Sequence, residues 1–243
     1  MSSELKTNKI SPATGTALQI GDSGDTITIA SGATLSGADM GLASVQVFTS
    51  SGTWNRPTGI TKVVIHVVGG GGGGGGGRSA YNYTRDVGGA GGLAIKFLDV
   101  SSISSSTITV GAATSEAAVD SDGADGNNSS WADGTNTITA NGGGHGDRGG
   151  DTIFRAGGSA SGGDINVTGG SGSCQPQGQH NDAGKAAGRG GVCAHGFGGG
   201  PGASIATNSN NNATGYGHGG SGGPTNSTGG SGAPGIVIVW EYK

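Results

Sequence analysis

Hydrophobic residues are concentrated in short segments in which they alternate with polar residues. These segments are 45–48, 62–68, 93–100, 106–110 and 236–242. A period of two places the apolar side chains of an extended chain on one face, which is typical of a half-buried β-strand. We therefore predict a small β-sheet module over 45–68, 93–110 and 235–242, in which the last strand pairs with the earlier ones.

Turn-forming residues separate the strands of this module. Ser-Gly-Thr-Trp at 51–54 and Arg-Pro-Thr-Gly at 56–59 predict two turns, because Gly and Pro favour turn conformations. We expect Phe48 and Trp54 to supply most of the aromatic burial, and Trp240 to have a structural role in the last strand. No stretch combines helical periodicity with capping residues, so the fold class is mainly β with irregular structure and almost no α-helix.

The N-terminal segment differs from the rest of the chain. A polar stretch, 1–15, precedes apolar pairs at alternating positions, such as Leu18 and Ile20. Short strands of this kind bury little apolar surface and are better stabilised by further copies of the chain or by a host protein. We predict an arm and stalk segment over 1–44 that serves attachment and oligomerisation, and a second domain over 45–243. A homotrimer is the natural form of such a stalk, although the sequence does not count the subunits.

Glycine interrupts the strand pattern and dominates the composition. The chain has 243 residues, of which 58 are Gly, and nine consecutive glycines, 69–77, follow a strand directly. Further glycine-rich runs lie at 88–92, 142–150, 157–163, 169–172, 188–191, 196–202, 215–223 and 229–235. Glycine loses more conformational freedom on ordering than any other residue. Such runs are therefore either flexible linkers or segments packed where no Cβ fits.

Strands on both sides of the glycine-rich region favour packing over a flexible linker. Glycine segments can adopt the extended threefold polyproline-II helix, with a rise of about 3.1 Å per residue, and bond their N–H and C=O groups to neighbouring segments. We predict polyglycine-II helices over 69–92 and 140–235, joined by loops. Mid-run positions such as Gly71, Gly73 and Gly199 are expected to leave no room for a side chain.

The remaining composition argues against several classes of function. Hydrophobic residues are 31% and charged residues 12% of the chain, so the core is small or built from backbone. A net charge of −4 without a basic cluster argues against nucleic-acid binding. No apolar run approaches the ~18 residues of a membrane span, and the N-terminus lacks the apolar segment of a secretory signal. A protein of this kind that acts outside the cell would leave the host cytoplasm by lysis or within a particle.

Two cysteines, Cys174 and Cys193, lie 19 residues apart in the loop-rich half of the chain. A disulfide between them would stabilise the intervening loop by about 3 kcal/mol, and two free thiols are equally compatible with the sequence. His180 and His195 lie nearby, but these residues lack the spacing of zinc ligands. We expect neither a metal nor a cofactor.

The order of the segments resembles that of a known group of proteins. FTSSGTW and RPTGITKVVIHVVGGGGGGG are followed by GGAGGLAIKFLDVSSISSSTITVG, GGSASGGDINVTGG and finally GGSGAPGIVIVWEY. Over about 45–243 this order is similar to the glycine-rich tail-fibre and adhesin proteins of tailed bacteriophages. In the N-terminal segment, ATGTALQIGDSGDTITIASGATLSG is similar to stalk segments of tail-fibre proteins from marine phages, including cyanophages.

The resemblance implies a virion protein at the tip of a tail fibre. Its glycine segments would form a polyglycine-II sandwich, and its loops would bind a host receptor such as an outer-membrane protein or lipopolysaccharide. Other tail proteins would hold the N-terminus. The chain departs from the long-tailed-phage adhesins in having its own stalk-like segment, so it either caps a separate fibre or is itself the whole short fibre.

Receptor contacts are expected in the loops, because a rigid scaffold commonly leaves binding to the loops that it displays. Tyr provides contact area at low entropic cost, Arg binds acidic groups, and amides bind hydroxyl groups. The candidates are Tyr81, Tyr83, Arg85 and Asp86 in the loop 78–86, Gln177, His180 and Asn181 in 175–185, and Asn208, Asn210 and Tyr216 in 204–216. The alternative for each loop is an ordinary solvated connection. Turn chemistry is the simpler explanation for one further polar cluster, which comprises His145, Asp147, Arg148 and Asp151.

The sequence offers little support for an enzyme. A glycosidase needs two carboxylates about 5–9 Å apart in a cleft, whereas the 16 acidic residues are scattered. Several stand in Asp-Gly pairs at 122–123, 125–126 and 133–134, which are more simply turns or occasional Ca²⁺ ligands. No catalytic triad pattern stands out, and Arg78-Ser79 does not continue the glycines as a phosphate-binding loop would.

Two alternatives to an adhesin remain from the sequence. One is a fibre shaft or connector that holds other tail parts and touches no host. The other is a glycine-rich ice-binding or matrix protein, which the irregular loops disfavour.

The loop 78–86 gives the first testable prediction. Replacing Tyr81 and Tyr83 by Ala should lower adsorption to host cells without changing the melting temperature, because exposed loop aromatics contribute contact area rather than core packing. Binding of labelled protein to permissive cells measures the effect. Unchanged adsorption of the double variant would remove this loop from the receptor site.

Overall fold

The computed structural model describes residues 41–77, 86–148, 155–172, 190–195, 212–223 and 226–243, together with Thr14, Gly24, Thr26 and Ser31. The chain divides into two units, Met1–Asp39 and Met40–Lys243. In the first unit only the four single residues are described, and all four are exposed. The strands predicted for the stalk segment therefore lie outside the described residues.

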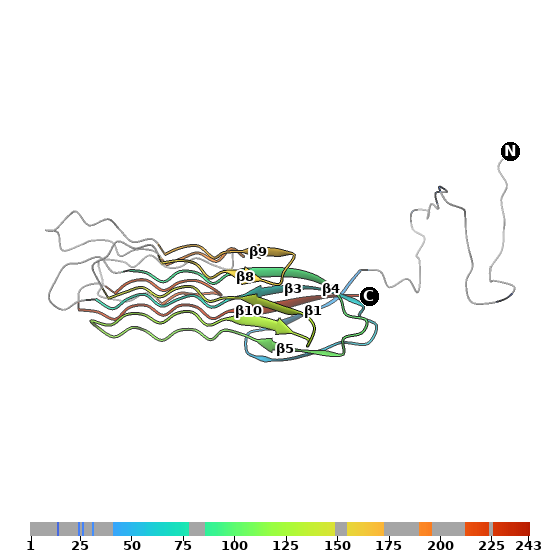
Figure 1. Cartoon of the computed structure of the whole chain (residues 1–243), viewed down its shortest axis with the longest axis horizontal. Helices are drawn as coiled ribbons and strands as arrows, with labels where there is room; N and C mark the ends of the chain where they lie inside the picture. Colours follow the sequence, from blue (N-terminus) through green and yellow to red (C-terminus); the bar gives the residue numbers. More distant parts are fainter. Residues whose placement is uncertain are drawn as a thin grey trace. The chain divides into compact units, whose positions relative to one another are not determined.

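The second unit is built from two five-stranded antiparallel sheets (Figure 1). Sheet A has the order β1-β10-β3-β4-β9, and sheet B has the order β2-β5-β6-β7-β8. The strands are β1 (Leu42–Phe48), β2 (Gly52–Asn55), β3 (Lys62–Val68), β4 (Leu93–Asp99), β5 (Ser105–Thr109), β6 (Ser129–Ala132), β7 (Thr137–Ala140), β8 (Ala160–Ser161), β9 (Ile165–Val167) and β10 (Ile236–Tyr242). The predicted mainly-β class is confirmed. Within the described ranges no residue is helical, and no helix could span a membrane.

The sheets pack face to face around one apolar core. The period-two pattern explains this packing, because alternate residues of a strand point to the same side. Buried members of the core include Val63, Ile65, Val67, Val237 and Val239 of sheet A and Trp54, Ile108, Trp131 and Ile138 of sheet B. The ring centroids of Trp54 and Trp131 lie 4.9 Å apart. Trp131 thus shares the aromatic centre with the predicted Trp54, while Phe48 is only partly buried.

Most of the predicted sheet module is confirmed, including the pairing of β10 with β1 and β3. The predicted turn at 51–54 is wrong, because Gly52–Asn55 forms β2 and pairs with β5. Extended backbone at this point carries the Trp54 ring into the core, where it is fully buried. The turn at 56–59 is confirmed by Gly59, whose φ of 84° lies in the left-handed region. The sequence did not predict β6 to β9, of which β8 and β9 interrupt the region expected to be polyglycine-II.

Glu241 ties β1 and β2 to β10. Its side chain is completely buried, and its carboxylate accepts hydrogen bonds from Trp54 Nε1 and Gln46 Nε2, both at 2.7 Å, and from Ser44 Oγ. A buried carboxylate requires donors of this kind, since its charge would otherwise be costly to remove from water. The acidic residue therefore fixes the position of both neighbouring strands.

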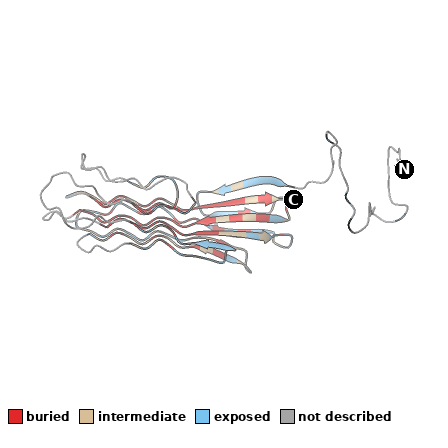
Figure 2. Cartoon of the chain, turned by 90° about the horizontal axis from the view of Figure 1, so that it is seen from above, coloured by how far each residue is buried: buried red, intermediate tan, exposed pale blue. Residues whose placement is uncertain are grey.

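The glycine segments continue the strands and lie side by side (Figure 1). In the segment 69–77 the N–H groups donate to three neighbouring segments in turn, so that every third N–H bonds to the same neighbour. The set that begins at Gly69 bonds to 86–92, the set from Gly70 to 121–127 and the set from Gly71 to 227–233, with N···O distances of 2.8–3.0 Å. A threefold cycle of this kind is the pattern of an extended helix with three residues per turn. These segments thus form a lattice of polyglycine-II helices rather than a linker. Figure 2 shows that burial continues from the central strands along these segments.

The space around the glycines explains why side chains are missing. A Cβ added to Gly71 would lie 1.9 Å from the backbone oxygen of His218, a distance that forces the backbone apart. At Gly73 the nearest atom is Thr114 Oγ1 at 3.0 Å, so the expected exclusion of a side chain is looser there. Gly199 lies outside the described residues.

Two neighbouring glycines provide a matched test of the lattice. A Cβ at Gly143 would lie 2.0 Å from the backbone oxygen of Gly89, whereas a Cβ at Gly144 meets nothing closer than the oxygen of Ala156 at 3.4 Å. Gly143→Ala should lower the free energy of unfolding by more than about 3 kcal/mol, since overpacking against backbone cannot relax. Gly144→Ala should change it by less than about 1 kcal/mol. Denaturant melts of both variants measure the difference, and equal stability would contradict close backbone packing.

Candidate functional site

The glycine lattice has a distal end, away from the sheets, where its segments reverse direction. We define this end by residues 75–77, Asp86 and Arg155. Described residues next to four ranges of the chain reach this end: 78–85, 149–154, 173–189 and 224–225. Backbone hydrogen bonds show this, because Gly75 N–H donates to the carbonyl of Asp86, Gly77 N–H to that of Ser227 and Gly172 N–H to that of Arg155. The chain enters the unit at the opposite end, where Leu42 pairs with Tyr242.

A ladder of side-chain hydrogen bonds runs along the lattice toward this end. One segment carries three side-chain acceptors, each three residues from the next. They bond to three backbone N–H groups of an antiparallel segment, which are also three residues apart. Asp122 accepts from Arg148, Asp125 from His145 and Asn128 from Gly142, at 2.8–2.9 Å. Each side chain thus replaces the carbonyl that a further glycine segment would offer.

This ladder corrects the interpretation of two Asp-Gly pairs. Asp122-Gly123 and Asp125-Gly126 are extended parts of the lattice and not turns, because their carboxylates bond across to the next segment. Asp133-Gly134 is a true turn, with a φ of 93° at Gly134 and Asp133 Oδ1 accepting from the N–H of Asn136 at 2.7 Å. Asp122, Asp125 and Asn128 are spaced three residues apart, whereas Asp133 does not continue this spacing. That period was the sequence signal that distinguishes the extended Asp-Gly pairs from the turn.

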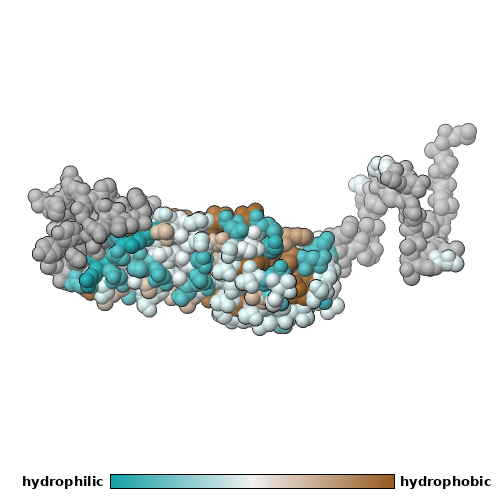
Figure 3. All heavy atoms as spheres, viewed as in Figure 1, coloured by the Kyte–Doolittle hydropathy of each residue, from teal (hydrophilic) through white to brown (hydrophobic). Residues whose placement is uncertain are grey.

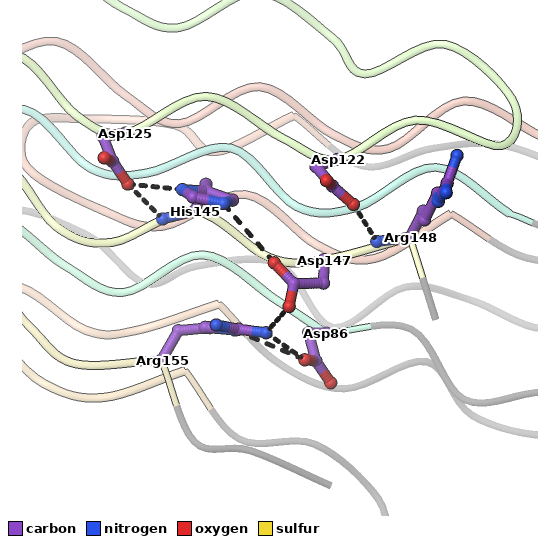
Figure 4. Close-up of polar contacts among 7 residues, drawn as sticks. All are labelled: Asp86, Asp122, Asp125, His145, Asp147, Arg148 and Arg155. Atoms are coloured by element: carbon purple, nitrogen blue, oxygen red, sulfur yellow. Dashed lines mark hydrogen bonds and ion pairs between the residues drawn. The ribbon is translucent and has the colours of Figure 1, made fainter. Parts of the chain in front are cut away.

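A chain of charged side chains crosses the distal end (Figure 4). His145 Nδ1 lies 2.6 Å from Asp125 Oδ1, and its Nε2 lies 3.4 Å from Asp147 Oδ1. Arg155 Nη2 pairs with the other oxygen of Asp147 and, at 3.0 Å, with Asp86 Oδ2. The chain therefore links four lattice segments, three of which lead into 78–85 or 149–154.

The network also shifts the pKa values of Asp125 and Arg155. Hydrogen bonds from the side chain and then the backbone N–H of His145 lower the pKa of Asp125. Partial burial opposes the charge of Arg155, but Asp86 and Asp147 outweigh it and raise the pKa of the guanidinium. Asp125 and Arg155 therefore stay charged at neutral pH. The side chains of Asp125 and Asp147 are 69% and 37% exposed, so their carboxylates are hydrogen-bond acceptors available to hydroxyl-bearing or peptide ligands.

Most members of the network were named from the sequence, in other roles. His145, Asp147 and Arg148 were assigned to turn chemistry, yet the structure brings the first two into the ion-pair chain and Arg148 into the ladder. Asp86, a predicted receptor contact, is 2% exposed and holds Arg155. Arg155 itself was missed, because a lone arginine among glycines carries no local pattern.

The other predicted contact residues fall mostly outside the described residues. These are Tyr81, Tyr83, Arg85, Asp151, Gln177, His180, Asn181, Asn208 and Asn210. Tyr216 is described, and it is half-buried against the apolar outer face of sheet A. The residues that flank the predicted loops 78–86 and 175–185 reach the distal end. The described residue that precedes the third loop, 204–216, is His195, and it lies beside His66 of β3, away from the distal end.

A second polar group lies on the outer face of sheet A. His66 Nδ1 and His195 Nε2 are 2.6 Å apart, and the His66 ring lies 6.3 Å from that of Trp240. Burial lowers the pKa of both histidines, and the neighbouring His195 lowers that of His66 further. Cys193 beside them is buried, and burial raises the pKa of its thiol.

Bonding of Cys193 to Cys174 stays a prediction, because Cys174 lies outside the described residues. In the part of the chain that the structure describes, no three His, Cys, Asp or Glu side chains are grouped to hold a metal ion.

Comparison with known proteins gives one finding. A family model described as a glycine-rich domain matches residues 46–242, which is most of the chain. No curated protein matches the chain.

The histidine pair predicts a loss of stability in mild acid. Because the folded pKa values lie below the ordinary 6.5, the unfolded chain binds more protons just below that pH, and stability falls as the pH drops below 6.5. The carboxylates with lowered pKa act in a separate window, below their ordinary 3.8. Thermal melts between pH 7.5 and 5 should show a drop of a few degrees that His66→Phe reduces. A flat profile for the unaltered protein would contradict the pair's burial.

Proposed function

We propose that this chain, which belongs to the glycine-rich domain family, is a bacteriophage tail-fibre protein that binds a receptor on the host cell. It would be part of the virion, with other tail proteins holding its N-terminal segment. Its receptor would be an outer-membrane protein or lipopolysaccharide. The family match supports the glycine-rich domain alone, so the attachment role is argued from the geometry below and from the resemblance of the segment order.

The separation of the two ends is the observation that carries this proposal. β1 brings the chain in beside the C-terminal strand, with Leu42 opposite Tyr242, while the segment ends around Asp86 and Arg155 gather at the far side of the lattice. A protein fixed at one end and displaying loops at the other suits attachment. Figure 3 agrees with this division, since apolar residues gather over the strands and hydrophilic residues lie toward the distal end.

The lattice provides the rigidity that loop recognition needs. Each segment is held by backbone hydrogen bonds at short intervals, as in the threefold cycle of 69–77. Loops that start from fixed positions lose less conformational entropy on binding. Several copies on one virion, as in a homotrimeric fibre, would multiply weak contacts through a high effective concentration. The mechanism is therefore multivalent docking without a chemical step.

Two exposed positions at opposite ends allow a direct test. Ala118 is exposed at the distal end, where its carbonyl lies against Gly76, and Ser102 is exposed in the turn after β4. Ala118→Arg should lower binding of the labelled full-length protein to permissive cells at least tenfold, because the new side chain blocks the approach of a receptor. Ser102→Arg, the matched control, should bind like the unaltered protein.

The test uses flow cytometry on a panel of marine bacteria, including cyanobacteria, with melting curves to verify folding. Equal loss in both variants would contradict a receptor site at the distal end. Absence of binding to every permissive strain would favour the connector role, in which the chain joins tail parts and touches no host.

A further inference from the structure

The edge of sheet A at β1 differs from the other sheet edges of the described strands. β9, β2 and β8 are edge strands of three, four and two residues. β8 also contacts β9 across the two sheets, which shields both. β1 has seven residues and pairs on one side with β10. Among the strands that the structure describes, it is therefore the long open edge.

β1 also lacks the features that protect natural edge strands. Proteins commonly place Lys, Pro or inward-pointing charges on an edge, or keep it short, because its free N–H and C=O groups otherwise pair with another chain. The β1 sequence, LASVQVF, has no charge and no proline. A register shift between Leu42 and Ser44 is the one irregularity, which leaves Ser44–Phe48 as a regular pairing edge.

Exposed apolar side chains accompany this edge. Val45 is 40% and Val47 is 55% exposed. Their register partners, Trp240 and Ile238 of β10, place them on the outer face of sheet A. On the opposite face Ser44 and Gln46 donate to the buried carboxylate of Glu241. The edge is thus held in a strand conformation before any partner arrives, which reduces the entropy lost on pairing.

We propose that β1 pairs with β1 of a second copy of this chain, antiparallel and about a twofold axis near Gln46. A strand without charges meets no like-charge repulsion from its own copy, and a twofold axis makes one patch serve both sides. In this register Val45 faces Val47 of the other copy, so both exposed valines become cross-strand pairs. The two A sheets then form one continuous sheet. This inference is independent of receptor binding at the distal end. Because a twofold contact joins two chains, in a homotrimeric fibre it would link a chain of one trimer to a chain of another.

Analytical ultracentrifugation of the full chain tests the proposal with a matched variant pair. Val47→Lys puts a charge on the β1 edge, and Ile165→Lys puts the same charge on β9, where Ile165 is 54% exposed against 55% for Val47. Both sites are exposed, so both variants should keep the melting temperature of the unaltered protein. The unaltered protein and Ile165→Lys should sediment as assemblies of two or more chains. Val47→Lys should sediment as a smaller assembly, because the contact between two β1 strands is lost. A monomeric unaltered protein at 100 µM overturns the proposal.

Residues 1–40 could also hold copies of the chain together, and ultracentrifugation does not show which residues form a contact. Crosslinking identifies the contact between β1 strands directly. The variant Val45→Cys/Val47→Cys should form a covalent dimer under mild oxidation, because each cysteine faces its counterpart across the axis. Ile165→Cys and the unaltered protein, which retains its own two cysteines, should not. A dimer band equal in all three proteins, or absent from the double variant, overturns the pairing of β1 with β1.

Discussion

Close approach of backbone to backbone is the constraint on which this structure depends. The segment 69–77 donates its N–H groups in rotation to three neighbours, and this is possible because no Cβ stands between them. A hydrogen bond contributes about 1 kcal/mol net, while ordering a residue's backbone costs about 1–2 kcal/mol. The lattice therefore needs a second source of stability, which the apolar core of the two sheets supplies.

The sheets position the lattice because its segments continue their strands. β3 and β4 pair from Lys62 opposite Asp99 to Val68 opposite Leu93, and the same antiparallel register continues as Gly69 N–H bonds to Gly92. Register in a sheet is fixed by which residues face the core. The core thus determines which glycine lies opposite which carbonyl several residues farther along.

Side chains enter the lattice where a segment lies at its surface. In the outer segment 111–120, Gly111, Thr114 and Ala117 are buried while most residues between them are exposed. The Asp122–Asp125–Asn128 ladder uses the same period of three to satisfy backbone N–H groups that no further segment covers. The charged chain from Asp125 to Asp86 is the continuation of this surface at the distal end.

The sequence by itself determined where the strands and glycine segments lie, because a period of two and an absence of side chains are local properties. It placed β3, β4, β5 and β10 and the packed glycine segment 69–77 correctly, whereas the lattice segment 121–128 and strands β6 to β9 were not predicted. Only the tertiary structure decided which segments are neighbours, and with that the roles of Trp131, Glu241 and Arg155. Trp131 and Glu241 are buried through partners far away in the chain, and Arg155 bonds to Asp86 from a separate segment. Local patterns carry no information about such partners, since the contact arises from the alignment of whole segments.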